Sequence, residues 1–103
     1  MKIIQYLSDK MQEEIHDAHE YAEKALEMRD SDKTLADNLF ELSTEEMRHM
    51  QILHAQAERI IAQYRKEKGE PPAAMLAVYD YLHKKQIEAA GEVKALQALY
   101  KEI

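Results

Sequence analysis

The chain has 103 residues, 46% of them hydrophobic, which fits a single globular domain over residues 1–103 and argues against intrinsic disorder. Its formal charge of −6 disfavours nucleic-acid binding, and no apolar run reaches the roughly 20 residues that a membrane span needs. The absence of cysteine excludes disulfides, thiol nucleophiles and Cys-ligated metals, and we expect a cytoplasmic protein.

Strong helix formers dominate the composition, and only two Gly and two Pro interrupt them, which predicts an all-α fold. Apolar residues recur at steps of three and four near the start of the chain, so the first helix is predicted over residues 2–29. Its apolar stripe consists of Ile4, Leu7, Met11, Ala18, Tyr21, Ala25 and Met28.

The segment 29–34 is rich in turn and N-cap residues and should separate the first helix from a second one over residues 34–68. A capping box at Ser43–Glu46 offers an alternative start at residue 43. We favour one continuous helix because its stripe crosses this box without a change of phase. That stripe consists of Leu35, Leu39, Leu42, Leu53, Ala57, Ile60 and Tyr64.

Gly69 suits the end of the second helix, and Pro72 suits the first turn of a third helix, which is predicted over residues 72–102. Each helix would be about 45 Å long, and short connections favour antiparallel neighbours. The sequence therefore predicts an up-down-up bundle of three long antiparallel helices. The third stripe consists of Met75, Val78, Leu82, Ala89, Val93, Leu96 and Tyr100.

Three ionisable residues occupy core positions of this pattern. Glu14 falls on the first stripe, and Glu46 and His49 fall on the second, whereas Glu13 and Glu45 should face solvent. A buried carboxylate is costly unless it is paired, protonated or bound to a cation. A hydrogen-bonded Glu–His pair or a solvated groove is the alternative to a metal site.

The turns near residues 31 and 70 predict that these residues share one level of the bundle. Residue 14 lies opposite residue 48 across the first turn, and Glu92 reaches the same level after the second. Glu92 could also be a surface residue. Carboxylates bind and bridge hard cations and imidazole adds a nitrogen ligand, so Glu14, Glu46, His49 and Glu92 are the candidate metal ligands.

Several motifs resemble those of rubrerythrins. These are Glu14 with Tyr21 seven residues on, Glu46-Met47-Arg48-His49, and Ala89-Ala90-Gly91-Glu92 with Tyr100 eight residues on. The chain departs from that family at Ala95, where a second carboxylate would stand, and in lacking a fourth helix. It is closer in this respect to the encapsulated ferritins, which resemble half a ferritin and complete a di-iron site across a dimer interface.

This resemblance implies a ferritin-like protein that binds iron as a di-iron site across a homodimer or a ring of dimers. Zinc or manganese would also suit these ligand types. It implies oxidation of ferrous iron by O₂ or peroxide, as in a ferroxidase or a rubrerythrin-like peroxidase, with no catalytic residues beyond the metal ligands. An iron-binding module without turnover and a metal-free helical adaptor are the alternatives.

The dimer would also cover an apolar flank that we expect beside the second stripe, at Phe40, Met47, Met50 and Ile61. Elsewhere on the chain, His16 and Glu20 could form a second, weaker metal site. His19, His54 and His83 fall off the stripes and should lie on the surface or the flanks.

Overall fold

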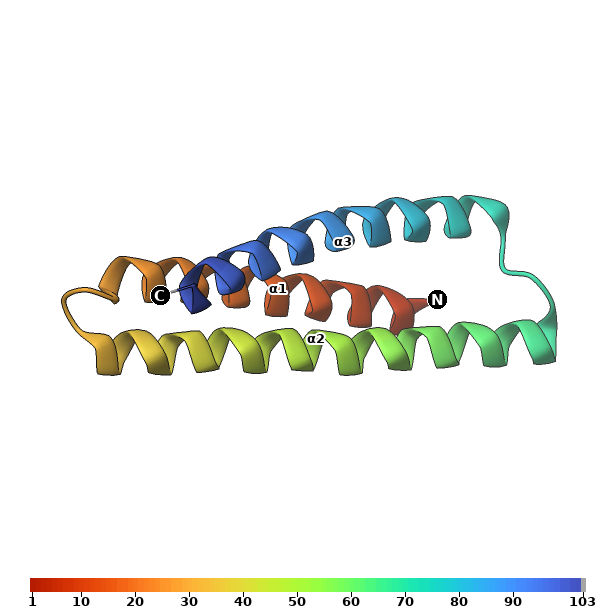
Figure 1. Cartoon of the computed structure of the whole chain (residues 1–103). Coiled ribbons are helices and arrows are strands. Elements are labelled where there is room, and N and C mark those ends of the chain that lie inside the picture. The colour runs from red at the N-terminus through yellow and green to blue at the C-terminus, as the bar shows by residue number, and fades with distance from the viewer. Residues whose placement is uncertain (103) are drawn as a thin grey trace.

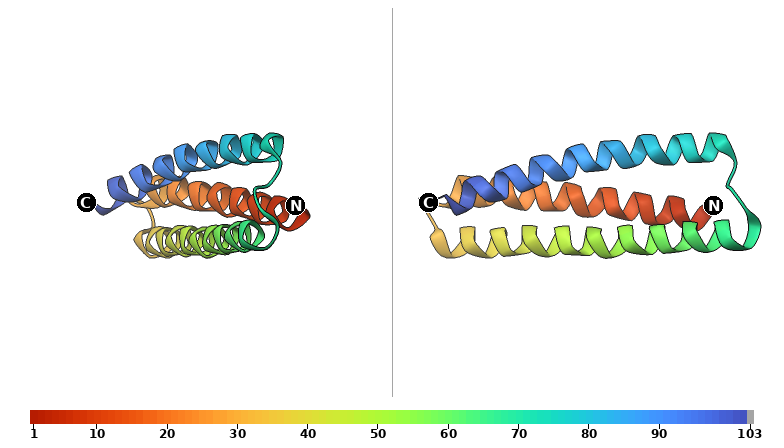
Figure 2. Two further views of the ribbon diagram at one scale, coloured as in Figure 1. Left: turned by 90° about the vertical axis from the view of Figure 1, so that its right-hand side faces the viewer. Right: turned by 45° about the vertical axis from the view of Figure 1, so that its right-hand side comes forward.

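A computed structural model describes residues 1–102 and consists of three long helices (Figure 1). Helix α1 spans Lys2–Met28, α2 spans Lys33–Lys68 and α3 spans Ala73–Lys101. Consecutive helices run in opposite directions, which confirms the all-helical, up-down-up arrangement (Figures 1 and 2). The helix ends agree with the predicted ranges to within one residue. Among residues 1–102, no helix combines the length and the apolarity needed to cross a membrane.

Local chemistry explains where the helices begin and end. The Asp32 carboxylate accepts a hydrogen bond from the backbone N–H of Leu35 (3.1 Å) and so caps the start of α2. Gly69 ends α2 with φ of 85°, a backbone conformation that favours glycine, and its N–H donates to the carbonyl of Arg65. Pro72 caps α3, and α2 runs through Ser43 without a break.

Helix α1 forms the centre of the core and packs against both other helices. Its buried side chains meet α2 along most of their shared length and meet α3 around Val93 and Tyr100. Two buried hydrogen bonds hold this packing in register: Ser43 Oγ donates to the carbonyl of Ala18 (2.6 Å), and Gln86 Nε2 donates to the carbonyl of Ser8 (3.1 Å). Helix α3 diverges from α2 toward its own N-terminal end (Figure 1).

The predicted buried face of α2 is displaced by one residue in the structure. The residues that are buried are Ala36, Ser43, Met47, Ala57 and Ile61. Leu35 and Leu42, which the sequence pattern placed in the core, are exposed. On this displaced face Met47 packs with Val93 of α3, whereas Ala57 and Ile61 pack against Ile4, Leu7 and Met11 of α1. Val78 of α3 is likewise exposed rather than buried.

The apolar flank expected at the surface of α2 is therefore covered, and that prediction is wrong. Met47 is only 5% exposed and packs with Val93, while Ile61 is buried against α1. Phe40 stacks on Tyr100 at 4.8 Å between ring centroids. The α1–α2 pair instead leaves its opposite face, on which Leu35 and Leu42 lie, without a covering helix.

Candidate metal centre

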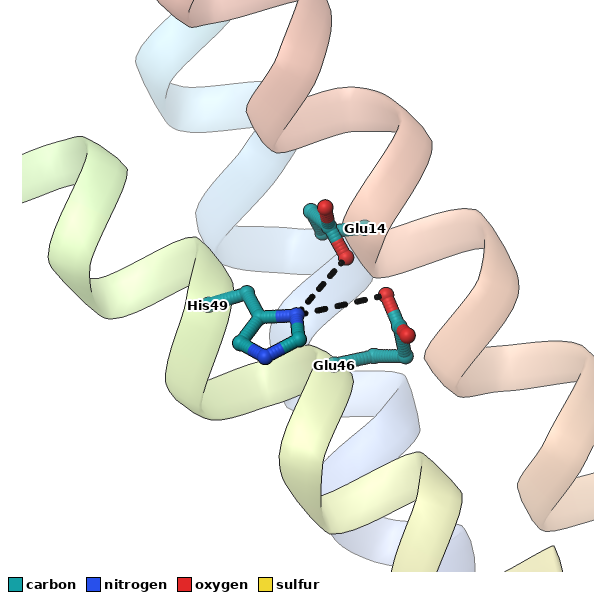
Figure 3. A group of neighbouring side chains, drawn as sticks. All are labelled: Glu14, Glu46 and His49. Atoms are coloured by element: carbon teal, nitrogen blue, oxygen red, sulfur yellow. Dashed lines mark ion pairs between the residues drawn. The ribbon is translucent and has the colours of Figure 1, made fainter.

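Glu14, Glu46 and His49 meet between α1 and α2, as their predicted levels in the bundle required (Figure 3). One donor atom from each residue lies within 4.8 Å of the other two. His49 Nδ1 is 3.5 Å from Glu14 Oε2 and 3.9 Å from Glu46 Oε2. Figure 3 shows both carboxylates directed toward the same edge of the imidazole ring, with α3 passing behind the helix pair.

The three side chains lie at the edge of the core rather than inside it. The side chains of Glu14 and Glu46 are 24% and 19% exposed, and that of His49 is 45% exposed. The sequence pattern placed all three in the core. On α2 the inward direction passes through Met47 instead of through Glu46, and on α1 Ile15 is buried next to the partly exposed Glu14. The group is therefore open to solvent on the face opposite α3.

One atom of this group lacks a partner within the described chain. Glu14 Oε2 is buried and has no hydrogen-bond donor among residues 1–102. His49 Nδ1 lies 3.5 Å from this oxygen, which is too long for a hydrogen bond. A buried carboxylate oxygen without a donor costs about 1–3 kcal/mol or more. A cation bound beside Glu14 would remove this cost.

The spacing of the donor atoms also fits a cation. Oxygen and nitrogen ligands that each lie about 2.1 Å from one metal ion are about 3–3.5 Å apart. The distances from His49 Nδ1 to the two carboxylates, 3.5 and 3.9 Å, are close to this separation. Two carboxylates with one imidazole suit iron, zinc and manganese, whereas a pure carboxylate set would suit calcium or magnesium. The donor set therefore fits the metal that the sequence resemblance implied.

Glu92 does not join the other three candidates. Its side chain is 72% exposed, and its carboxylate lies 3.9 Å from His19 Nε2 on α1. Being at the same height along the bundle does not bring Glu92 to the other three residues. On α3 it is Val93 that points inward, and Glu92 lies about 100° around the helix from it.

The other histidines lie outside this group. His16 is exposed and meets the carboxylates of Asp17 (3.8 Å) and Glu20 (3.6 Å) in a second cluster on the surface of α1. The sequence reasoning named His16 and Glu20 but missed Asp17, whose only signal was its place next to His16. His54 and His83 are partly buried and stack across α2 and α3 with ring centroids 4.8 Å apart.

No protein-family model matches the chain, and neither a curated protein nor a solved structure is similar enough to indicate a relative. The resemblance to rubrerythrins and encapsulated ferritins thus stays a prediction from the motifs around Glu14, Glu46 and His49.

Proposed function

We propose that this chain is a cytoplasmic, ferritin-like metal-binding protein that oxidises ferrous iron at a site formed by Glu14, Glu46 and His49. The observation that carries the proposal is the buried Glu14 Oε2, which has no donor and lies within 4.8 Å of a second carboxylate and an imidazole nitrogen. Such an arrangement is unfavourable without a cation and favourable with one.

The roles of the three residues follow from their positions. Glu14 and Glu46 supply negative charge from facing helices and would be the carboxylate ligands of a divalent ion. His49 supplies a nitrogen ligand from the more exposed side. Two ferrous ions held there would supply two electrons together, enough to reduce O₂ with two protons to hydrogen peroxide while the iron becomes ferric.

One chain supplies only half of the ligands expected for such a site. Bundle proteins with two iron ions use about four carboxylates and two imidazoles from four helices. Two copies of Glu14, Glu46 and His49 would give this number, and the solvent-open side of the group leaves room for a second copy. We therefore propose that the working form is a homodimer with the site at its two-fold axis.

Metal binding is tested by titrating the chelator-treated protein with ferrous iron under anaerobic conditions. We expect about one iron per chain. Glu46→Ala and His49→Ala should each abolish most of the binding, and Glu45→Ala is the matched control because Glu45 is exposed and lies next to Glu46. An equal loss in the control would contradict the assignment of the site.

Oxidation is tested separately by mixing the iron-loaded protein with O₂ and following oxygen consumption and ferric absorbance. Turnover above that of His49→Ala supports a ferroxidase. Binding of iron without oxygen consumption would replace this function with that of an iron-binding module. The absence of any metal binding would leave the helical adaptor as the remaining function.

A further inference from the structure

A groove runs between α2 and α3, and the proposed metal site does not use it. Its volume is about 370 Å³, within the range of roughly 300–1,000 Å³ that small-molecule sites occupy. The groove lies between the two helices that diverge from each other in Figure 1, whereas the candidate metal ligands lie between α1 and α2. The groove is therefore a separate feature of the molecule.

The floor of the groove is apolar. Met50 of α2 and Ala90 of α3 line it and pack on the buried cluster that contains Met47 and Val93. Ile87 lies one turn before Ala90 on the same side of α3 and is 58% exposed. Covering this apolar surface would be favourable, so the floor favours a ligand with an apolar body.

Gly91 leaves open space in the wall of the groove. Glycine inside a helix is less stable than alanine, and two structural reasons for such a glycine do not apply here. Among residues 1–102 only Gly69 has a positive φ, and a Cβ atom added to Gly91 would meet nothing within 4 Å, so no neighbouring helix requires the small residue. A larger side chain at Gly91 would instead fill space that a ligand could occupy.

The one charged side chain at the groove is basic. Within residues 1–102 no Asp or Glu lines it, although the chain has 20 acidic residues. Lys94 lines one end, and none of the ion pairs formed by residues 1–102 includes it. At the other end, the stacked rings of His54 and His83 separate the groove from a more polar hollow that Glu58 lines. The charge of Lys94 favours an anionic group at its end.

We propose that this groove binds a free fatty acid, with the hydrocarbon chain on Met50, Ile87 and Ala90, beside Gly91, and the carboxylate on Lys94. The lining residues of α3 extend from His83 to Lys94, about 16 Å along the helix axis, so the groove is long enough for an extended chain. This inference is independent of the proposed function, because none of the candidate metal ligands takes part in it.

Octanoate and 1-octanol are the probes, since they share one hydrocarbon chain and differ in charge. Each is titrated into ¹⁵N-labelled, chelator-treated protein, and binding is followed by the amide resonances in nuclear magnetic resonance spectra. We expect one octanoate per chain, shifts centred on Ile87, Gly91 and Lys94, and weaker binding of 1-octanol. Shifts centred outside the groove, or no saturable shifts, would overturn the proposal.

Lys94→Gln tests the position of the carboxylate. The affinity for octanoate should fall about two- to fivefold, the range for an exposed ion pair, and the affinity for 1-octanol should not change. Lys84→Gln is the control, because Lys84 is an exposed lysine of α3 that does not line the groove. An unchanged preference for octanoate over 1-octanol in Lys94→Gln would refute the role of Lys94.

Gly91→Leu tests the position of the hydrocarbon chain. This variant should lose binding of both probes while staying folded by circular dichroism, because the added side chain meets open space. Ala74→Leu, at an exposed position of α3 outside the groove, should bind both probes like the wild type. Full binding by Gly91→Leu would overturn the proposal. If neither probe binds the wild type and Gly91→Leu changes its sedimentation, the groove holds a second copy and not a fatty acid.

Discussion

Replacing Glu14 with Gln should stabilise the metal-free protein. The Glu14 and Glu46 oxygens lie within 4.8 Å of each other, and two unit charges at that distance repel by about 3.5 kcal/mol at an effective dielectric constant of 20 and by about 0.9 kcal/mol in water. Because both side chains are partly exposed, we expect a gain of about 1–2 kcal/mol, which corresponds to roughly 5–10 °C in Tm for a domain of this size.

The measurement is urea or thermal unfolding of the protein at pH 8 in the presence of a chelator. Glu45→Gln is the matched control and should change stability by less than about 0.5 kcal/mol, since Glu45 is exposed. Added metal should make the wild type more stable than Glu14→Gln, because a ligand at 100 times its Kd stabilises the protein that binds it by about 2.7 kcal/mol. A metal-free Glu14→Gln variant that is less stable than wild type would refute the reasoning.

Three further predictions concern the bundle itself. Met47→Ala should lower the free energy of unfolding in urea by about 2–5 kcal/mol, because Met47 is buried. Val78→Ala is the control and should change this free energy by less than about 0.5 kcal/mol, because Val78 is exposed. Equal effects of the two substitutions would contradict the burial pattern. Asp32→Ala should cost about 1 kcal/mol by removing the cap of α2, and a neutral result would contradict the capping bond. Burial, followed by the hydrogen bond to Asp37, raises the pKa of Tyr100 to about 12 from an ordinary value of 10.0, so its stabilising effect is complete below pH 10 and is lost as the pH rises toward 12. Unfolding measured from pH 9 to 12 should show this loss in the wild type and not in Tyr100→Phe.

The helix ranges could be predicted because their signals are local. The helix ends are set by residues that start or stop a helix through nearby backbone groups, independently of the rest of the chain: Asp32, Gly69 and Pro72. The meeting of Glu14 with the Glu46–His49 pair was equally predictable, since a short turn between two straight helices fixes which residues lie opposite one another.

The rotation of each helix was less predictable. Apolar residues cover a wide arc of α2, from Leu42 through Leu39 to Met47, so several stripes fit the sequence about equally well. Packing against the other helices, mainly α1, selects among these stripes, and no signal within α2 reports how α2 will be turned in that packing. Glu92 is a different case, because its level along the bundle followed from counting residues while the predicted stripe already placed its neighbour Val93 in the core, where the structure has it.

The divergence of α3 from α2 has a consequence for the order of folding. The three candidate metal ligands lie within the α1–α2 pair, whose helices are joined by one short turn, so bringing these helices together costs little chain entropy. Helix α3 then packs on the α1–α2 pair after that pair has formed, and its N-terminal half, which diverges from α2, is the less closely packed half (Figure 1). We therefore expect each chain to bring its three candidate ligands together before α3 has packed, so that a metal ion bound to a folding intermediate would favour the final topology.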